Sequence, residues 1–307
     1  MAVDLVDVIV PTYKRPDLLE EALASIADAS PAGCIRAILV GDDTPDDRVA
    51  AKNREVIAAS TFATRTQYFR NRPSLGNYPN QWALASQVEA PYMLILHDDD
   101  HLAPGSIDTL VEMAGADSDD SVVLWFGRHD LMGPDGDVEA EASIANNAHF
   151  KRGGDPFTLP LWRLALDQTV PPNSFLIRSG AYREFMGGAR EGNVGDITLI
   201  IRLANAGFSG SYAPFHNFTY RRHPDSNTGR GGEDVHYKFE AFESLVVPHD
   251  FEAQKATVLR YYAPVAARCY ARRGERGRAW AVLNSKVFPG RLTKEGAKTI
   301  VTMVLPV

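Results

Sequence analysis

Residues 92–100 read Tyr92-Met93-Leu94-Ile95-Leu96-His97-Asp98-Asp99-Asp100, an apolar run that ends abruptly in a histidine and three aspartates. A short run of this kind, without alternating polar residues, is typical of a strand that is buried on both faces. Such strands belong to parallel sheets covered by helices, which bind ligands at the carboxyl ends of their strands. The stretch therefore predicts a buried strand that ends at a ligand site.

Two earlier segments of the chain have the same arrangement. Val6–Val10 is an apolar run closed by Pro11-Thr12-Tyr13-Lys14-Arg15, and Ala37–Val40 ends in Gly41-Asp42-Asp43. Carboxylates gathered at neighbouring strand ends repel one another unless a cation lies among them, and oxygen ligands suit Mg²⁺ or Mn²⁺. An isolated Asp-Asp pair is more often a solvated loop or a helix cap. Three aligned strand ends favour a metal and phosphate site over that alternative.

Helical segments separate these strands, and further elements follow them. The spacing of apolar residues predicts helices over 17–27, 80–88 and 105–114, a polar helix that ends at 59, and strands over 66–69 and 122–126. Strands that alternate with helices predict an α/β fold with a mostly parallel sheet covered on both faces. Residues 127–160 are expected to form loops and short elements. A strand at 175–177, a helix at 196–206 and a basic helical tail from 246 complete the expected order.

Composition limits the classes of function. The chain has 307 residues, 45% hydrophobic and 23% charged, which suits one large domain or two modest ones. Its net charge of −7 argues against a general nucleic-acid binder. Cys34 and Cys269 form no CxxC pair, so we expect neither a disulfide framework nor a zinc site, and a reducing cytoplasm fits best. We expect no signal peptide and no membrane span.

The sequence resembles the family 2 glycosyltransferases, which have the nucleotide-diphospho-sugar transferase fold, GT-A. Five segments in the order typical of the family, spanning roughly residues 5 to 228, carry the resemblance. They are Val8-Ile9-Val10-Pro11-Thr12-Tyr13-Lys14-Arg15, Leu39-Val40-Gly41-Asp42-Asp43, Tyr92 to Asp100, Gly195-Asp196-Ile197-Thr198-Leu199 with Arg202-Leu203, and Tyr220-Arg221-Arg222-His223. The resemblance implies a GT-A domain with a mostly parallel sheet flanked by helices, followed by a helical C-terminal tail.

The resemblance also implies an activity. It predicts a soluble, inverting, metal-dependent glycosyltransferase that moves a sugar from a nucleoside diphosphate, with UDP or dTDP favoured, to a hydroxyl acceptor. The acceptor would be a saccharide, a lipid-linked molecule or a small molecule, and the cofactor Mn²⁺ or Mg²⁺. Residues 1–126 would be the nucleotide-sugar-binding half, 127–245 the acceptor-binding half with the catalytic base, and 246–307 a helical extension.

Residue by residue, the resemblance assigns roles around the donor. Asp196 would be the general base, because the acceptor hydroxyl is a weak nucleophile whose proton must be removed as it attacks. Asp99 would bind the metal, with His223 as a further protein ligand. Arg221 or Arg222 is expected to pair with phosphate oxygens. The base and ribose would be bordered by Pro11, Thr12, Tyr13, Arg15, Asp42, Asp43 and Asp98, with Asp43 accepting a hydrogen bond from the N3–H of uracil or thymine.

The sequence departs from the family pattern at His97, which stands where many members have the first aspartate of the acidic motif. This departure leaves open which of Asp98, Asp99 and Asp100 binds the metal, and Asp99 is favoured. A zinc site formed by His97 and His101 is disfavoured, because the segment lacks the HExxH arrangement. Asp196 alone could equally be a helix N-cap.

Two other functions remain as alternatives. A sugar nucleotidyltransferase would share the sheet and the metal, but it would follow the first strand with a glycine-rich phosphate loop, which is absent here. A non-catalytic nucleotide-sugar binding protein would be expected to lose the base or the metal ligands, and Asp196 and Asp99 are both present. For the tail, a solvated helix surface is favoured over a peripheral membrane contact through Lys286–Val307.

Overall fold

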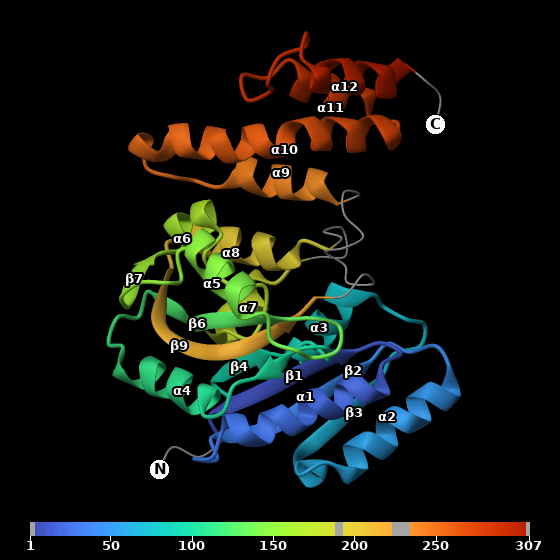
Figure 1. Cartoon of the computed structure of the whole chain (residues 1–307), viewed down its shortest axis with the longest axis vertical. Coiled ribbons are helices and arrows are strands. Elements are labelled where there is room, and N and C mark those ends of the chain that lie inside the picture. The colour runs from blue at the N-terminus through green and yellow to red at the C-terminus, as the bar shows by residue number, and fades with distance from the viewer. Residues whose placement is uncertain (1–3, 188–192, 223–233, 305–307) are drawn as a thin grey trace.

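The computed structural model describes residues 4–187, 193–222 and 234–304. Figure 1 shows a curled sheet with helices packed on it, and a stack of further helices at one end of the long axis of the molecule. Among the helices in these ranges, none is long and apolar enough to span a lipid bilayer.

A single mixed sheet forms the centre of the fold, with the strand order β3-β2-β1-β4-β8-β6-β9-β5 and β7 paired with β9. The four strands β3, β2, β1 and β4 pair in parallel, β8 pairs antiparallel with both of its neighbours, and β6 and β9 are again parallel. The predicted parallel sheet therefore describes the first half of the fold, and the second half is mixed. The strands are β1 (Val6–Thr12), β2 (Ile35–Asp42), β3 (Thr66–Arg70), β4 (Tyr92–Ile95), β5 (His101–Leu102), β6 (Val122–Met132), β7 (Phe157–Pro160), β8 (Leu176–Arg178) and β9 (Ser209–Arg221).

The strand register brings the polar strand ends to one edge of the sheet. Every residue of β1 is buried, and β1 lies between β2 and β4. Thr12 pairs directly with Asp42 across β1 and β2, one residue beyond the pairing of Pro11 with Gly41. Gly41 permits close packing at this edge, because a Cβ atom there would lie 2.3 Å from the Asn80 side-chain oxygen.

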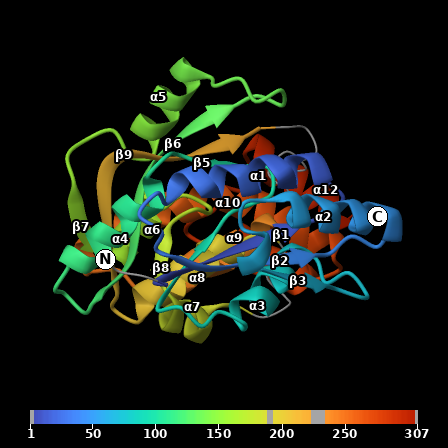
Figure 2. The ribbon, with the colours of Figure 1, turned by 90° about the horizontal axis from the view of Figure 1, so that it is seen from below.

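The helices cover both faces of the sheet, and two hydrophobic clusters lie under them. One cluster joins β1 and β2 to the apolar faces of α1 and α4, and the other joins the sheet to α3, α6, α7 and α8. Figure 2 shows these helices on the two sides of the strands. The helices are α1 (Pro16–Ala29), α2 (Asp47–Ala59), α3 (Asn77–Ala85), α4 (Ser106–Ala116), α5 (Ala140–His149), α6 (Leu161–Asp167), α7 (Ser179–Phe185), α8 (Gly195–Asn205), α9 (Val235–Ser244), α10 (Glu252–Arg272), α11 (Arg276–Leu283) and α12 (Lys294–Val304), with short 3₁₀ helices η1 (Ala63–Arg65) and η2 (His249–Phe251).

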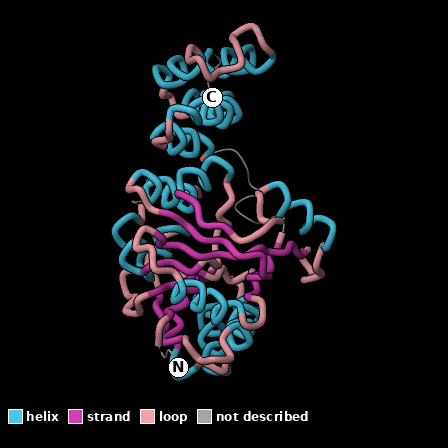
Figure 3. Tube along the Cα trace, turned by 90° about the vertical axis from the view of Figure 1, so that its left-hand side faces the viewer, coloured by secondary structure: helices cyan, strands magenta, loops and turns pink. Residues whose placement is uncertain are grey.

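The C-terminal helices belong to the same core as the sheet domain. Phe239 and Phe242 of α9, and Tyr262 and Ala263 of α10, are buried in the cluster that also contains the core residues of α8. Figure 3 shows this stack of helices continuing from the sheet domain. The tail is helical, as predicted, and it packs on the sheet domain through α9.

Two segments differ from the sequence-based expectation. Residues 127–160 were expected to be loops and short elements, but they contain the second half of β6, the helix α5 and the strand β7. Residues 209–221 form the long strand β9, which no prediction covered. The two differences are linked, because the second half of β6 and the strand β7 both pair with β9.

Candidate active site

The carboxyl ends of β1 and β4 are joined by hydrogen bonds from β1 residues to the acidic triplet. Thr12 Oγ1 donates to Asp98 Oδ2 at 2.8 Å, and the backbone N–H of Tyr13 donates to the same oxygen at 3.3 Å. Arg15 Nη1 donates to Asp99 Oδ2 at 2.7 Å and lies 3.5 Å from Asp98 Oδ1. The structure thus brings together Thr12, Tyr13, Arg15, Asp98 and Asp99, as the strand ends predict.

The acidic triplet carries more negative charge than its protein neighbours compensate. Burial, and then the charge of Asp99, raises the pKa of Asp98 to about 7, although Arg15 and Thr12 act in the opposite direction. Burial and the same neighbouring charge raise the pKa of Asp100 well above its ordinary value. Added cationic charge at this place would stabilise the ionised carboxylates.

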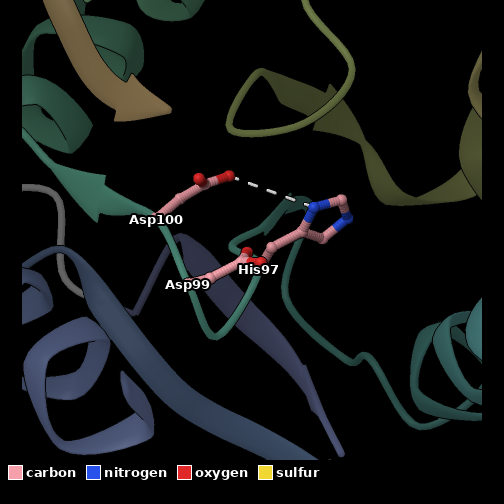
Figure 4. Close-up of side chains that lie close together, drawn as sticks. All are labelled: His97, Asp99 and Asp100. Carbon is pink, nitrogen blue, oxygen red and sulfur yellow. Dashed lines mark ion pairs between the residues drawn. The ribbon is translucent and has the colours of Figure 1, made fainter. Parts of the chain in front are cut away.

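One group of side chains in the described ranges has the donor atoms for a metal ion. Ligand atoms of His97, Asp99 and Asp100 all lie within 4.8 Å of one another, and Figure 4 shows the three side chains projecting from the turn that follows β4. Burial lowers the pKa of His97, so its imidazole is neutral near pH 7 and has a lone pair to offer. An imidazole with two carboxylates suits Mn²⁺ and is acceptable to Mg²⁺. The residues present therefore fit the predicted metal.

His97 contributes to this group although the family pattern has an aspartate at its position. Asn173, from the segment before β8, orients the group: its Nδ2 atom lies 2.9 Å from His97 Nδ1 and 2.7 Å from Asp100 Oδ2. His101 points elsewhere and contacts Glu21 at 3.0 Å. His101 therefore lies outside the group formed by His97, Asp99 and Asp100.

Arg221 fixes the acidic turn from β9 and does not face outward. Its backbone N–H donates to Asp100 Oδ1 at 2.8 Å, and its Nε donates to the carbonyl oxygen of Asp99 at 3.0 Å. Its two terminal nitrogens donate to the Pro134 carbonyl oxygen and to Glu21. All three guanidinium nitrogens of Arg221 thus have protein partners in this structure, and the expectation that Arg221 or Arg222 pairs with phosphate oxygens stays a prediction. Arg222 is half exposed and pairs with Glu139.

Asp43 organises the loop over residues 71–76. Its Oδ1 accepts hydrogen bonds from Asn71 Nδ2 and the Leu75 N–H, at 3.1 and 2.7 Å. Its Oδ2 accepts from Ser74 Oγ and the Gly76 N–H, at 2.5 and 2.8 Å. These four bonds match the acceptor capacity of a carboxylate. Asp43 therefore holds the wall of the predicted base pocket.

Asp42 lies beside Asp43 but faces the interior. It accepts hydrogen bonds from the Thr44 N–H, Asn53 Nδ2 and the Tyr68 hydroxyl, at 2.9, 3.0 and 2.6 Å. Burial acts to raise its pKa, but these hydrogen bonds outweigh burial and lower it. The side chain is completely buried.

Asp196 lies in the first turn of α8, and its Oδ1 accepts a hydrogen bond from the Tyr78 hydroxyl at 3.0 Å. Burial, and then the charge of Asp196, raises the pKa of Tyr78 well above its ordinary value, so Tyr78 remains a donor. The N-cap residue of α8 is Val194, and no side chain caps the helix. The alternative that Asp196 is the N-cap is therefore wrong.

The first turn of α3 links the predicted base pocket to Asp196. Gly76, whose N–H donates to Asp43, is the N-cap residue of α3, and Tyr78 follows two residues later. Gly195 lets α8 approach Tyr78, since a Cβ atom at Gly195 would lie 2.5 Å from the tyrosine ring. One turn after Tyr78 on the same helix, Gln81 Nε2 lies 3.5 Å from His97 Nε2, so α3 contacts both Asp196 and the acidic turn. The sequence contained no local signal for Tyr78.

The remaining predicted site residues are placed as follows. Pro11 is buried in β1, whereas the Tyr13 side chain is 46% exposed beside it. His223 lies outside the described residues, so its role as a metal ligand stays a prediction from the sequence.

The mixed α/β fold, with an acidic turn at its parallel strand ends and an aspartate held across from it, defines an enzyme of the glycosyltransferase class with the GT-A fold. The chain belongs to the glycosyl transferase family 2, whose pattern matches residues 7–168, more than half of the sequence. The predictions of this fold and enzyme class are confirmed. Membership also decides against the sugar nucleotidyltransferase alternative.

Individual relatives are distant. The uncharacterized protein MT1568 of Mycobacterium tuberculosis (strain CDC 1551 / Oshkosh) is 29% identical over 106 residues, which cover 34% of this chain and 31% of that protein. The crystal structure of S. aureus TarS 1–349 shares 15% identity with a TM-score of 0.61, and covers 97% of this chain and 88% of its own. Its complex with UDP-GlcNAc has a TM-score of 0.63 at 14% identity, covering 97% and 89% of the two chains. These structures share the fold of this chain.

Proposed function

We propose that the chain is an inverting glycosyltransferase that moves a sugar from a UDP or dTDP donor to a hydroxyl acceptor, with Asp196 as the general base. The observation that carries this proposal is the Asp196 carboxylate, held by Tyr78 of α3, the helix whose Gln81 reaches His97 of the acidic turn after β4. The similar fold of S. aureus TarS, solved with UDP-GlcNAc and with UDP, supports a uridine diphosphate donor.

Asp196 has the geometry of a base with one oxygen fixed and one available. Tyr78 donates to Oδ1, and Oδ2 accepts no hydrogen bond from the described residues. The acceptor O–H bond breaks as its proton passes to Oδ2, and the acceptor oxygen bonds to the anomeric carbon of the sugar. The bond from that carbon to the diphosphate oxygen breaks at the same time. A single displacement inverts the configuration at the anomeric carbon.

The acidic turn supplies the proposed metal site. His97, Asp99 and Asp100 would hold Mn²⁺ or Mg²⁺, with His223 as a further ligand suggested by the sequence. When bound, the metal would stabilise as a Lewis acid the negative charge that develops on the departing diphosphate. Arg15 occupies the cationic position beside Asp99 in this structure, and it can exchange that carboxylate for a phosphate oxygen.

The donor nucleoside would lie along the ends of β1 and β2. Tyr13 offers a half-exposed ring beside Pro11 and Thr12, and Asp98 faces the same side from β4. Asp43 would form the base pocket by fixing residues 71–76, and a hydrogen bond from the base N3–H would replace one of its four protein donors. Asp42, which is completely buried, would support the loop over residues 71–76 from the protein interior.

Donor turnover tests the proposal. The purified protein is incubated with UDP-GlcNAc, other UDP-sugars and dTDP-sugars, with Mn²⁺ or with EDTA, and release of the nucleoside diphosphate is measured. Slow metal-dependent release is expected even without an acceptor, because water can replace the hydroxyl. Nucleotide binding without any release would favour the non-catalytic nucleotide-sugar binding protein. The division at residues 126 and 245 and the cytoplasmic location stay predictions.

We expect Asp43→Ala to weaken UDP binding by about 1.5–3 kcal/mol, the cost of losing a hydrogen bond to a charged group. The carboxylate anchors the loop that walls the pocket, so its loss frees four donors at once. Titration calorimetry with UDP measures the change. Asp46→Ala is the matched control, because Asp46 caps α2 in the same connection but points to solvent. Equal affinities for wild type and Asp43→Ala would remove Asp43 from the pocket.

We expect Tyr78→Phe to lower kcat roughly 10–100-fold with little change in the donor KM, the effect of one hydrogen bond to a charged group. The Tyr78 hydroxyl fixes one oxygen of the Asp196 carboxylate, so its loss should affect the proton-transfer step and not donor binding. Tyr182→Phe is the control, since Tyr182 is equally buried and feels the Asp196 charge. A kcat equal to that of wild type would show that Tyr78 only packs against Gly195.

A further inference from the structure

The charge of the chain is distributed unevenly between its two ends. Residues 252–307 contain eleven Lys and Arg residues and three Glu residues, a net charge of +8. The whole chain carries −7, so the preceding residues carry −15. Figure 1 shows that α11 and α12 form the outermost layer at the end of the molecule opposite the N-terminal strands. Six of the eleven basic residues lie on α11, on α12 or between them, and so belong to this outermost layer.

Apolar side chains are exposed within this basic layer. Leu292 is fully exposed, and Trp280 and Val301 are 49% and 53% exposed. Trp280 lines a cavity of about 280 Å³ between α11 and α12, together with Arg276, Gly277, Ile300 and Met303. We call the surface formed by Arg276, Trp280, Arg291, Leu292, Ile300 and Val301 the tail patch. Cationic and apolar groups are interleaved on it.

The cations of the tail patch are available to a partner. The Arg291 guanidinium lies 5.7 Å from the centre of the Trp280 ring. Neither Arg276 nor Arg291 forms an ion pair with a carboxylate in the part of the chain that the structure describes. Arg278, two residues further along α11, does pair, with Glu240 at 2.8 Å. The exposed residues Lys286 and Lys294 extend the positive charge around the patch, whereas Lys298 pairs with Glu295 at 3.3 Å.

We propose that the tail patch binds the surface of an anionic membrane. Leu292, Trp280 and Val301 would enter the interface between headgroups and acyl chains, where aromatic and aliphatic side chains are stable. Arg276, Arg291 and the surrounding lysines would lie at the level of the lipid phosphates and gain from the negative surface potential. A nucleic acid would use the cations but leave Leu292 in water, so an anionic lipid surface accounts for both kinds of group.

This inference does not depend on the proposed glycosyl transfer, because vesicle binding requires no substrate. If both hold, the catalytic sheet is kept close to a bilayer, and lipid-linked hydroxyl acceptors become the favoured acceptor class.

The test is co-sedimentation of the full chain with vesicles of phosphatidylcholine alone, and with vesicles in which part of the lipid is phosphatidylglycerol. The chain should sediment with the anionic vesicles only, and binding should weaken as salt screens the charges. The emission of Trp280 should shift to shorter wavelength on binding. Trp280→Phe keeps an aromatic ring, so this variant should still bind but lose most of that shift.

Two variants separate the charged and apolar contributions. The double variant Arg276→Glu with Arg291→Glu should weaken binding by ~10-fold or more, since each basic residue near such a surface contributes about 1 kcal/mol. Leu292→Ser, at a side chain without packing to lose, should weaken binding without changing the thermal unfolding temperature. Arg48→Glu with Lys52→Glu, the same charge reversal on the exposed face of α2, should bind as wild type.

Three outcomes would overturn the proposal. They are the absence of binding to anionic vesicles, equal binding by the tail-patch variants and wild type, and equal binding to neutral vesicles. Light scattering during chromatography provides a further check. If wild type self-associates and both tail-patch variants are monomeric, the partner of the patch is a second copy of the chain. A gel-shift assay with single-stranded RNA tests a nucleic acid in the same way: RNA binding by wild type that both tail-patch variants lose would make a nucleic acid the partner of the patch.

Discussion

Asp196→Asn is expected to reduce sugar transfer by about 10²–10⁴-fold, the contribution typical of a general base, while donor binding stays unchanged. The amide keeps the shape of the carboxylate and can still accept the Tyr78 hydrogen bond, but it cannot take the acceptor proton. The proposed metal and nucleotide contacts lie on the turn after β4 and on the ends of β1 and β2, not on α8. The loss should therefore fall on kcat.

Single-turnover rates and calorimetry with UDP separate these two effects. Asp17→Asn is the matched control, because Asp17 also lies in the first turn of a helix, but on the exposed side of α1. It reproduces the loss of negative charge at a helix N-terminus without touching the site. Normal transfer by Asp196→Asn would exclude Asp196 as the base.

The second large effect is expected for Asp99→Asn, which should abolish the gain in UDP affinity that Mn²⁺ brings and lower turnover by about 10²–10³-fold, because Lewis-acid stabilisation supplies several kcal/mol. Without metal, the variant should be at least as stable as wild type. The Asp99 charge raises the pKa values of both Asp98 and Asp100. Removing that charge reduces the repulsion among the three carboxylates, which in the wild type a bound cation would reduce.

Calorimetry with UDP, in Mn²⁺ and in EDTA, measures the first effect, and thermal unfolding in EDTA measures the second. Asp98→Asn is the comparison, since Asp98 faces Thr12 and Tyr13 and lies outside the group of metal donors. It should weaken UDP binding in both conditions. If Asp99→Asn keeps its dependence on Mn²⁺, the ligand role moves to Asp100 and His97.

The first half of the fold was predictable because its strands are locally distinct. β1, β2 and β4 are apolar runs with abrupt polar ends. A short segment of sequence is therefore enough to predict both that each strand is buried and that its carboxyl end borders the ligand site. β9 has no such pattern. It interleaves Ser209, Gly210, His216 and Asn217 with aromatic residues, and its strand conformation depends on pairing with β6 and β7.

The candidate site also has one part that local sequence predicts and another part that it does not. The acidic triplet is a single turn, so its residues meet whatever the rest of the chain does. The contact of Tyr78 with Asp196 joins residues 118 positions apart, and Arg221 reaches Asp100 from 121 positions away. No periodicity or motif indicates such pairs, because tertiary packing alone creates them. The metal-binding potential of His97 did have a local signal, its place in the acidic motif.

The burial of α9 and α10 against the sheet domain has a consequence for how the molecule folds. Phe242 and Leu245 are covered by Tyr262 and Ala263, within the cluster that also buries Leu199 and Leu203 of α8. The helix that carries Asp196 therefore shares its hydrophobic support with the tail. A chain cut short at residue 245 would leave that support open to water, and its catalytic half would lose order together with the missing helices. The intact protein should accordingly melt as one cooperative unit, and the tail is part of its minimal folding unit.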